Sequence, residues 1–333
     1  MIDVLTSKRF WKEFDWFLLL VALLLCTIGL IEIYSATLNM ESASYFLRQA
    51  AWVGIGICIM FAVASLDYRV LGENVFLIYG LFIVLLVSVL LFGDSISGAR
   101  SWFRVGSFGL QPSEFTRLVV AISLARYLAS HRQRYLTLKQ IGVAVAICGL
   151  PVMLVVLQPD LGTALTFIPI LALGLFVRGV RPAVLISGCL ILIMLLPLAW
   201  FVLEDYQRDR ILTFIQPESD PLGRGYQVIQ SKIAVGSGGL LGRGLFEGSQ
   251  NQLGFLPTRH TDFIFSVVAE ELGFVGVSIA LALLLALVWR SLALAMAPLD
   301  TFGLLLVVGI LGMFAGHIII NVGMVIGFLP STG

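Results

Sequence analysis

Three neighbouring side chains near residue 260 could carry out chemistry together. Arg259 is a cation that can bind phosphate, His260 has a ring that titrates near neutral pH, and Asp262 has a carboxylate that can act as a general base. They directly precede a long apolar run, so we expect a helix to start there. Because a helix start favours anions, simple capping is an alternative role for Asp262, and the pKa of its carboxyl group should be low.

A second polar cluster runs from Gln111 to Arg117. Pro112 suits the first turn of a helix, which places Glu114 in that turn. Arg117 follows three residues later on the same helix face and can pair with Glu114. The pair is either a structural ion pair or part of a polar cavity, because ionisable residues at membrane depth are costly and tend to face functional sites. The other residues expected to line such a cavity are Trp102, Arg104, Gln111 and Asp160.

Other polar residues have both a structural and a functional interpretation. Asp160 can cap the helix that follows it or contact a substrate. Glu270 and Glu271 are adjacent in an apolar run and cannot share a helix face, so at least one is expected to pair with a cation or to bind a proton. His317 and Asn321 are four residues apart, a spacing typical of hydrogen bonding between membrane helices.

The glycine-rich run at residues 236–244 does not have the features of a nucleotide-binding loop. It lacks the Gly-Lys-Ser/Thr ending of a phosphate loop, and no strand precedes it. We expect a hinge or a close-packed turn instead.

The composition defines the environment of these residues. Of the 333 residues, 59% are hydrophobic and 12% are charged, and the mean hydropathy is +1.00. Soluble globular proteins have about 45–50% apolar and about 25% charged residues. A soluble globule and a disordered chain are therefore excluded, and the net charge of +1 gives no indication of nucleic-acid binding. We expect an all-α polytopic membrane protein.

Nine apolar runs are candidates for membrane-spanning helices, each of which needs about 20 residues. They lie near residues 16–34, 50–66, 75–92, 114–128, 141–157, 161–176, 183–203, 264–289 and 302–329. The short loops place eleven Lys and Arg residues on the side of the N-terminus and three on the other side. Because basic residues favour the cytoplasmic side, the N-terminus is expected in the cytoplasm.

Two segments on the outer side are longer than the other connections, at residues 93–113 and 204–261. In a chain with otherwise short loops, a connection as long as the second one is usually functional. Within it, residues 226–235 mix apolar and polar side chains in a pattern typical of a short amphipathic helix at the membrane surface. We expect a single integral membrane domain over residues 1–333.

Four stretches make the chain resemble the SEDS family (shape, elongation, division and sporulation). They are GARSWFRVGSFGLQPSEF, QPDLGTAL, DYQRDRILTFIQPESDPLGRGYQVIQSKIAVGSGGL and FLPTRHTDFIFSVVAEELG. Together with the matching pattern of spans, they cover nearly the whole chain. The long outer segment resembles the elongation branch of the family more than the division branch.

The resemblance implies a bacterial peptidoglycan glycosyltransferase of the cytoplasmic (inner) membrane that polymerises lipid II during cell elongation. It also implies a class B penicillin-binding protein and other elongation-complex membrane proteins as partners. Asp262 matches the acidic residue regarded as catalytic, Glu114 matches a buried glutamate, and the family usually has lysine in place of Arg117. The family has a tenth span, whereas this sequence ends at Gly333 after nine, so we expect the last span to be missing from it.

The reaction implied by the resemblance is an inverting displacement. The 4-hydroxyl of the acceptor sugar attacks the anomeric carbon of the donor, and undecaprenyl pyrophosphate leaves. Asp262 would be a weak base with late proton transfer, and positive charge would stabilise the leaving group. That charge would come from a divalent cation (Mg²⁺ or Mn²⁺) or from basic side chains, and no nucleotide is required. The basic candidates on the outer side are Arg104, Arg210, Lys232, Arg243 and Arg259.

Two other classes of function fit a polytopic protein of this kind, a lipid II flippase and a non-catalytic scaffold for the penicillin-binding protein. A flippase should have polar positions spread through its spans. Here the ionisable residues gather at the outer face, which favours chemistry there. The glycines of the last two spans allow close helix packing, so we expect the partner's helix near residues 281–288 or 304–313, with crosslinks to Leu284 or Leu306.

Overall fold

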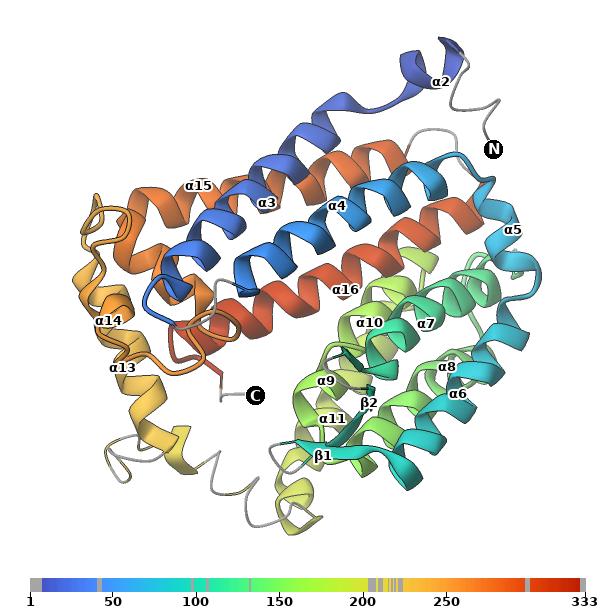
Figure 1. Ribbon diagram of the computed structural model, residues 1–333. Helices are drawn as coiled ribbons and strands as arrows, with labels where there is room; N and C mark the ends of the chain where they lie inside the picture. Colours follow the sequence, from blue (N-terminus) through green and yellow to red (C-terminus); the bar gives the residue numbers. More distant parts are fainter. Residues whose placement is uncertain are drawn as a thin grey trace. The chain divides into compact units, whose positions relative to one another are not determined.

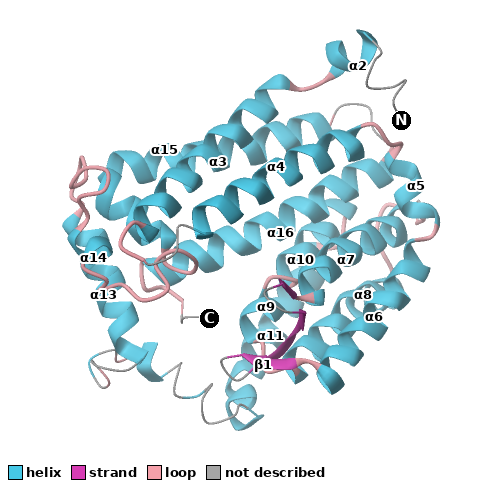
Figure 2. Cartoon of the chain, viewed as in Figure 1, coloured by secondary structure: helices cyan, strands magenta, loops and turns pink. Residues whose placement is uncertain are grey.

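Long apolar helices make up most of the chain (Figures 1 and 2). The computed structural model describes residues 8–40, 44–96, 99–105, 108–131, 133–202, 208, 212–214, 216, 218, 220, 224–296 and 300–329. The helices are α2 (Lys8–Glu13), α3 (Trp16–Thr37), α4 (Ser44–Ala64), α5 (Tyr68–Glu73), α6 (Val75–Phe92), α7 (Pro112–Ala129), α8 (Leu138–Leu157), α9 (Leu161–Leu165), α10 (Ile168–Arg178), α11 (Pro182–Val202), α13 (Arg224–Ser237), α14 (Ser249–Gln252), α15 (Ile264–Ala295) and α16 (Thr301–Val325). The strands are β1 (Asp94–Ile96), β2 (Ala99–Val105) and β3 (Phe108–Leu110).

Seven helical segments among the described residues are long and apolar enough to cross a membrane. They are α3, α4 from Tyr45, α6, α8, the α9–α10 segment, α15 and α16. The chain is therefore a multi-pass membrane protein. The predicted spans at 114–128 and 183–203 coincide with α7 and α11, but α7 contains the ionisable residues Glu114, Arg117 and Arg126. The count of nine spans stays a prediction.

The segment between α6 and α7 folds as a small antiparallel sheet, so the all-α prediction is wrong there. Strand β2 pairs with β1, where Asp94 is opposite Trp102, and with β3, where Phe103 is opposite Leu110. Trp102, Phe103 and Val105 are residue types that favour strands. With strands of only 3 to 7 residues, the alternation of side chains is too brief to distinguish a strand from a loop in the sequence.

The contacts divide the chain into two compact units. Unit 1 consists of Met1–Asp67, Asp209–Ser291 and Asn321–Ser331, and unit 2 consists of Tyr68–Arg208, Leu292–Ile320 and Thr332–Gly333. Each unit combines segments that are far apart in the sequence. Tertiary packing therefore decides which polar side chains meet within each unit.

Helix α7 forms the centre of unit 2. Val120, Leu124 and Leu128, spaced four residues apart, are buried on one of its faces. They pack in cores that include residues of α6, α8, α10 and α16. This burial on several sides holds α7 in place although it carries three ionisable residues.

Close packing between α10 and α16 also belongs to unit 2. A Cβ on Gly312 would lie 2.8 Å from the Cα of Ile170, so only glycine fits at this crossing. Leu305 and Leu306 of α16 lie in the same core, and Leu306 is only 7% exposed. The predicted crosslink from a partner helix to Leu306 is therefore wrong, because that side chain already packs within the protein.

In unit 1, α3 and α15 run antiparallel beside each other (Figure 1). Asp15 caps α3 by accepting a hydrogen bond from the N–H of Leu18 (2.8 Å), and it forms an ion pair with Arg290 of α15 (2.6 Å). Toward the other end of α3, the Ser35 hydroxyl donates to Glu271 of α15 (2.5 Å). Polar contacts thus join the two helices at both ends.

Helix α15 is interrupted at Gly273, whose φ of 64° and ψ of −163° favour glycine. The glycine-rich run pairs with the interrupted backbone. The N–H groups of Phe274 and Val275 donate to the carbonyl oxygens of Gly239 (2.9 Å) and Leu240 (3.1 Å). Backbone groups freed by a helix break in a bilayer need such partners, because hydrocarbon supplies none.

Close packing explains two glycines of this run, Gly238 and Gly242. A Cβ on Gly238 would overlap the carbonyl oxygen of Ala269, and one on Gly242 would overlap that of Glu271. Gly242 also has a φ of 82°, which side chains rarely adopt. The expectation of a close-packed turn at residues 236–244 is confirmed.

Helix α13, which precedes this turn, contains the predicted amphipathic helix at 226–235. Val228, Ser231 and Ala234 are buried on one face. The Ser231 hydroxyl donates to the carbonyl oxygen of Val325 (2.8 Å) and hydrogen-bonds to Ser266 (2.9 Å). The buried face of α13 therefore packs on protein; its position at a membrane surface stays a prediction.

Glu270 and Glu271 accept hydrogen bonds from neutral donors. The carboxylate of Glu270 accepts from the backbone N–H groups of Gln250 (2.8 Å) and Asn251 (3.1 Å), and that of Glu271 accepts from the N–H of Phe246 (2.9 Å). Among the described residues neither carboxylate forms an ion pair. The cation alternative is therefore wrong there, because loop backbone and neutral side chains provide the donors, and the other alternative, that one of the two binds a proton, stays a prediction.

Glu32 is a buried carboxyl group whose removal should stabilise the protein. Its side chain in α3 is 0% exposed, and within the described chain neither oxygen has a hydrogen-bond partner. A buried unpartnered polar group costs about 1–3 kcal/mol. We expect Glu32→Leu, which keeps a similar volume, to raise the thermal midpoint of the purified protein. A lower midpoint would mean that the carboxyl group makes a stabilising contact.

Candidate functional site

Asp262 lies in a tight turn at residues 258–263 that leads into α15, here called the Asp262 turn. The carbonyl oxygen of Thr258 accepts hydrogen bonds from the N–H of Thr261 (3.0 Å) and from its hydroxyl (3.2 Å). Thr258 has a φ of 44°, which is rare for a β-branched residue. Strained backbone of this kind is common at functional sites.

The environment of Asp262 makes its carboxylate a better base than the sequence indicates. Burial raises the pKa of Asp262, and the nearby His260 offsets only part of this effect. Helix α15 begins two residues later, at Ile264, so Asp262 lies outside the first helical turn. No residue of the described chain donates a hydrogen bond to its side chain. The predicted low pKa is wrong, because desolvation of the partly buried carboxylate raises the pKa.

His260 is held against α4 in a neutral state. Its ring packs on that of Tyr45, with 4.5 Å between centroids. Burial lowers the pKa of His260, and the positive charges of Arg259 and Arg48 lower it further against the opposing effect of Asp262. At neutral pH the ring is therefore uncharged, which makes it a polar neighbour of Asp262 and not a cation.

Arg259 has a structural role in the Asp262 turn. The side chain is 6% exposed. Its Nε donates to the carbonyl oxygen of Ala36 (2.8 Å), and its Nη1 donates to that of Asn251 (2.6 Å). These bonds engage two of its donor atoms with the backbone of the protein itself.

The other basic candidates are placed differently. Lys232 and Arg243 have exposed side chains in unit 1. Arg243 also donates to the carbonyl oxygen of Ser237 and to the hydroxyl of Ser249, both at 3.3 Å. Arg210 lies outside the described residues. Lys232 and Arg243 are therefore accessible cations on the same unit as Asp262.

Arg117 is the centre of a second polar cluster, in unit 2. It forms an ion pair with Glu114, as predicted, and its Nη1 donates to Thr166 (3.1 Å) and to Nε2 of His317. The Arg117 side chain is 1% exposed and that of Glu114 is 49% exposed. The expectation that Glu114 is buried is therefore wrong; the buried member of the pair is the cation. His317 contributes to helix contact, as its spacing indicated.

Asp160 extends this cluster. It caps α9 by accepting a hydrogen bond from the N–H of Thr163 (3.0 Å), which confirms the predicted cap. Its second oxygen accepts from the side-chain amide of Gln111 (3.0 Å), the residue before α7. The charge of Asp160 also acts electrostatically on Glu114 and Arg117. Four of the predicted cavity residues therefore meet in unit 2.

The sheet carries the remaining two predicted cavity residues, Trp102 and Arg104. The N–H of Arg100 on β2 donates to the carbonyl oxygen of Gln158 (3.2 Å), so the strand is held beside the turn that contains Asp160. Trp102 is partly buried and would contact any Cβ placed on Gly109. Arg104 is exposed. Strand β2 thus presents an accessible cation within unit 2.

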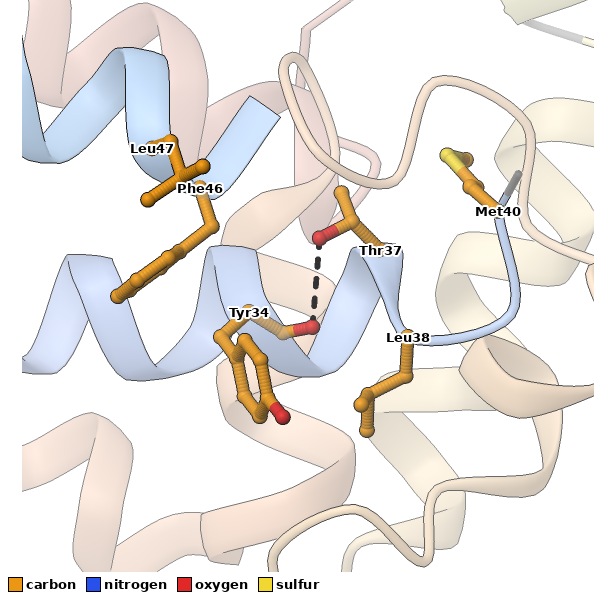
Figure 3. A pocket seen from close by; sticks show the side chains of 6 residues that line it. All are labelled: Tyr34, Thr37, Leu38, Met40, Phe46 and Leu47. Carbon is orange, nitrogen blue, oxygen red and sulfur yellow. Dashed lines mark hydrogen bonds between the residues drawn. The ribbon is translucent and has the colours of Figure 1, made fainter. Parts of the chain in front are cut away.

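An apolar pocket of about 350 Å³ lies between the end of α3 and the start of α4 in unit 1 (Figure 3). Its lining consists of Tyr34, Thr37, Leu38, Met40, Phe46 and Leu47. The Thr37 hydroxyl donates to the carbonyl oxygen of Tyr34 (3.3 Å). The Asp262 turn contacts Ala36 and Tyr45, each adjacent in sequence to a lining residue. Among the described residues that line the pocket none is charged, so this part of the lining suits an apolar group.

Residues distant in sequence complete both clusters. Tyr45 and Arg48 of α4 act on His260, while Thr166 and His317 complete the surroundings of Arg117. Sequence spacing links none of these to its partner. In the sequence, the only signal for the contacts of His260 was that Tyr45 and Arg48 are an aromatic and a cationic residue, types that can interact with a histidine ring.

These features define a multi-pass membrane protein with a partly buried carboxylate poised before one helix and an arginine-centred polar cluster at the start of another. The chain belongs to the FtsW/RodA/SpoVE family of cell cycle proteins, whose sequence model matches residues 15–333. This agrees with the resemblance found in the sequence.

Known proteins resemble the chain over almost its whole length. The peptidoglycan glycosyltransferase MrdB of Escherichia coli is 38% identical over 336 residues, covering 100% of this chain and 90% of that protein. A solved structure described as a peptidoglycan synthase complex that coordinates polymerization and crosslinking matches with a TM-score of 0.82 and 35% identity, covering 97% and 90% of the two chains. The Thermus thermophilus rod shape determining protein RodA, in an aspartate-to-alanine variant, matches with a TM-score of 0.71 and 28% identity, covering 97% and 89%.

Proposed function

We propose that this chain is a peptidoglycan glycosyltransferase that polymerises lipid II into β-1,4-linked glycan strands during cell elongation. The 38% identity to E. coli MrdB over the full chain supports this activity. The observation that carries the mechanism is the Asp262 carboxylate, which is partly buried, has a raised pKa and has no hydrogen-bond donor among the described residues. Such a group is available to accept a proton from a substrate.

In this mechanism Asp262 is the general base. It accepts the proton of the acceptor's 4-hydroxyl while that oxygen attacks the anomeric carbon of the donor. The bond from this carbon to the pyrophosphate oxygen breaks, and undecaprenyl pyrophosphate leaves with the electron pair. A single displacement inverts the anomeric centre. The raised pKa of Asp262 favours earlier proton transfer than a weak base would give.

Exposed cations are the best candidates to stabilise the leaving pyrophosphate. Lys232 and Arg243 lie on the same unit as Asp262 and have exposed side chains, so they can approach an anionic substrate. Arg104 is an exposed candidate in unit 2. Arg259 is a weaker candidate, because two of its donor atoms already bind backbone carbonyl oxygens.

The described residues do not form a metal site of their own. Among them, no cluster of three or more His, Cys, Asp and Glu side chains could hold an ion. Mg²⁺ often uses only one or two carboxylates together with substrate phosphates, but Asp262 without further ligands does not make a preformed site. We therefore assign the stabilising charge to basic side chains and derive no step through a divalent cation.

The proposed setting is the bacterial cytoplasmic membrane, with the N-terminus in the cytoplasm and Asp262 on the outer side. The distribution of Lys and Arg over the short loops supports this orientation. A class B penicillin-binding protein is the proposed partner, because the chain resembles a component of a peptidoglycan synthase complex.

A polymerisation assay with labelled lipid II tests the proposed function. The purified chain, with and without its penicillin-binding partner, is given labelled lipid II, and glycan strands are separated by length. We expect polymer from the complex. Translocation of lipid II across vesicles without polymer would identify a flippase, and neither activity in any preparation would identify a scaffold.

We expect the partner's single span to crosslink to helix α15. Leu281 and Leu285 of this helix are 37% and 68% exposed, which leaves an apolar face available for a helix. Paired cysteines in the partner span and at Leu285 should crosslink efficiently, whereas a cysteine at the buried Leu306 should not. Efficient crosslinks confined to α3, α4 and α6 would place the partner elsewhere.

A further inference from the structure

Four side chains and two backbone carbonyl groups are linked by hydrogen bonds next to the Asp262 turn. The Ser35 hydroxyl (2.5 Å) and the Asn251 amide (2.8 Å) both donate to Oε1 of Glu271. Arg259 donates to the carbonyl oxygens of Asn251 (2.6 Å) and Ala36 (2.8 Å). Because Ala36 follows Ser35 on α3, these contacts close a circuit, here called the Glu271 ring.

The Glu271 ring is buried. Ser35 and Glu271 are each 1% exposed, Asn251 is 0% exposed and Arg259 is 6% exposed. Hydrogen bonds that involve charged groups away from water are strong and directional, and a lost partner is costly there. The ring therefore holds its members in one arrangement.

Arg259 connects the Glu271 ring to the Asp262 turn. The Arg259 side chain donates hydrogen bonds to backbone carbonyl oxygens of α14 and α3. It lies three residues before Asp262. Both residues belong to the Asp262 turn, which is short and begins with the strained Thr258. A displacement of Arg259 is therefore passed on to Asp262.

We propose that the Glu271 ring positions Asp262 for proton transfer. In this role Glu271, Asn251 and Arg259 are positioning residues that act on Asp262 through the turn. The inference rests on the proposed function, in which Asp262 is the base. Catalysis is sensitive to such positioning, because a misplacement of about 1 Å can reduce the rate by about a hundredfold.

The first test is Asn251→Asp, which places a carboxylate against that of Glu271. Like charges at this distance repel each other, so the ring should open. We expect turnover in the lipid II assay to fall at least about tenfold while KM changes less than about twofold, because the base moves but the substrate-binding surfaces do not.

The second test adds Glu271→Gln to the same chain and should restore activity. The new amide nitrogen can donate to the introduced carboxylate and to the Ser35 oxygen, and the amide oxygen can accept the N–H of Phe246. In the double variant residue 271 thus becomes the donor and residue 251 the acceptor, so the hydrogen bond between these two positions is kept. We expect turnover within about threefold of the unmodified protein, because the geometry is recovered.

A matched control separates positioning from general stability. Val21→Ala removes buried apolar volume from α3, far along the helix from Ser35, and also belongs to unit 1. It should lower the thermal midpoint and leave turnover at the assay temperature unchanged. Equal losses of turnover in Val21→Ala and Asn251→Asp, at equal losses of thermal midpoint, would overturn the positioning role.

Other results decide the remaining cases. Full turnover in Asn251→Asp, or a double variant that folds but stays as slow as the single one, would overturn the inference. If Asn251→Asp does not fold, Ser35→Ala replaces it, and unchanged turnover in that variant would also overturn the inference. These outcomes are distinct from failure of the proposed function, in which the unmodified protein makes no polymer or Asp262→Asn remains active.

Discussion

Asp262→Asn should abolish glycan polymerisation while leaving the protein folded. Asparagine keeps the shape of the side chain but cannot accept the proton of the acceptor hydroxyl. Loss of a general base typically costs about 10²–10⁴-fold in rate. Purified variant and unmodified protein, each with the partner, should be compared in the lipid II assay at equal concentration. Polymerisation at the normal rate by the variant would exclude Asp262 as the base.

The pH dependence of the unmodified protein should report the same group. Burial raises the pKa of Asp262 above its ordinary value of 3.8, so turnover should fall as the pH is lowered toward this raised pKa. His260, whose pKa is lowered, serves as the control. A His260→Gln variant that keeps the acid limb of the profile would assign the limb to Asp262, and loss of the limb would assign it to the histidine.

Asp262→Asn should also raise thermal stability at neutral pH. The pKa of Asp262 is higher in the folded than in the unfolded chain, so protonation of this carboxyl group favours the folded state. This stabilising contribution is fully present at pH values below the unfolded pKa and is lost as the pH rises through the folded pKa. The ionised carboxylate therefore destabilises the fold at pH 7. The variant lacks this charge, so its thermal midpoint should exceed that of the unmodified protein at pH 7. The difference should disappear near the unfolded pKa.

Charge reversal at either Glu114 or Arg117 should impair activity, with the larger effect at Arg117. Arg117→Glu removes a cation that is 1% exposed and leaves Thr166 and His317 without their donor. Breaking a buried pair costs about 3–5 kcal/mol. Glu114→Arg places a second cation beside Arg117 but in a position that is half exposed, where water screens it. Thermal midpoints and turnover of both variants measure these effects.

Exchanging the two residues should restore part of the activity. The double variant recovers the opposite charges at the same spacing, but the buried position then holds a carboxylate next to His317. Arg117→Lys is the matched control, since it keeps the charge but loses the planar fork that contacts Thr166 and His317 together. Equal losses in both single variants and in the exchange, at normal expression, would mean that the two residues do not act as a pair.

Local features of the site could be predicted because they depend on spacing along one helix. The Glu114–Arg117 pair needs only a separation of three residues, and the Asp160 cap needs only a helix start after it. The close-packed turn at residues 236–244 follows from its glycines. Each of these depends on the few residues nearest to it, so the sequence is sufficient.

Features that combine separate segments could not be predicted. The role of Arg259 depends on a carbonyl oxygen of α3 and another of α14, residues 36 and 251. The Glu271 carboxylate finds its donors on Ser35, Asn251 and Phe246 instead of on a cation. No spacing rule brings these positions together, because they meet only after the helices have packed.

The amino-acid sequence by itself determined that this is a polytopic membrane protein and which family it belongs to, and it singled out Asp262 and Glu114 as candidate site residues. Hydropathy, charge distribution and motif composition are properties of the chain that folding does not change. Only the tertiary structure decided how these residues behave. Burial raised the pKa of Asp262, and packing buried Arg117 instead of Glu114. Burial depends on all neighbours in space, and most of those neighbours are remote in the sequence.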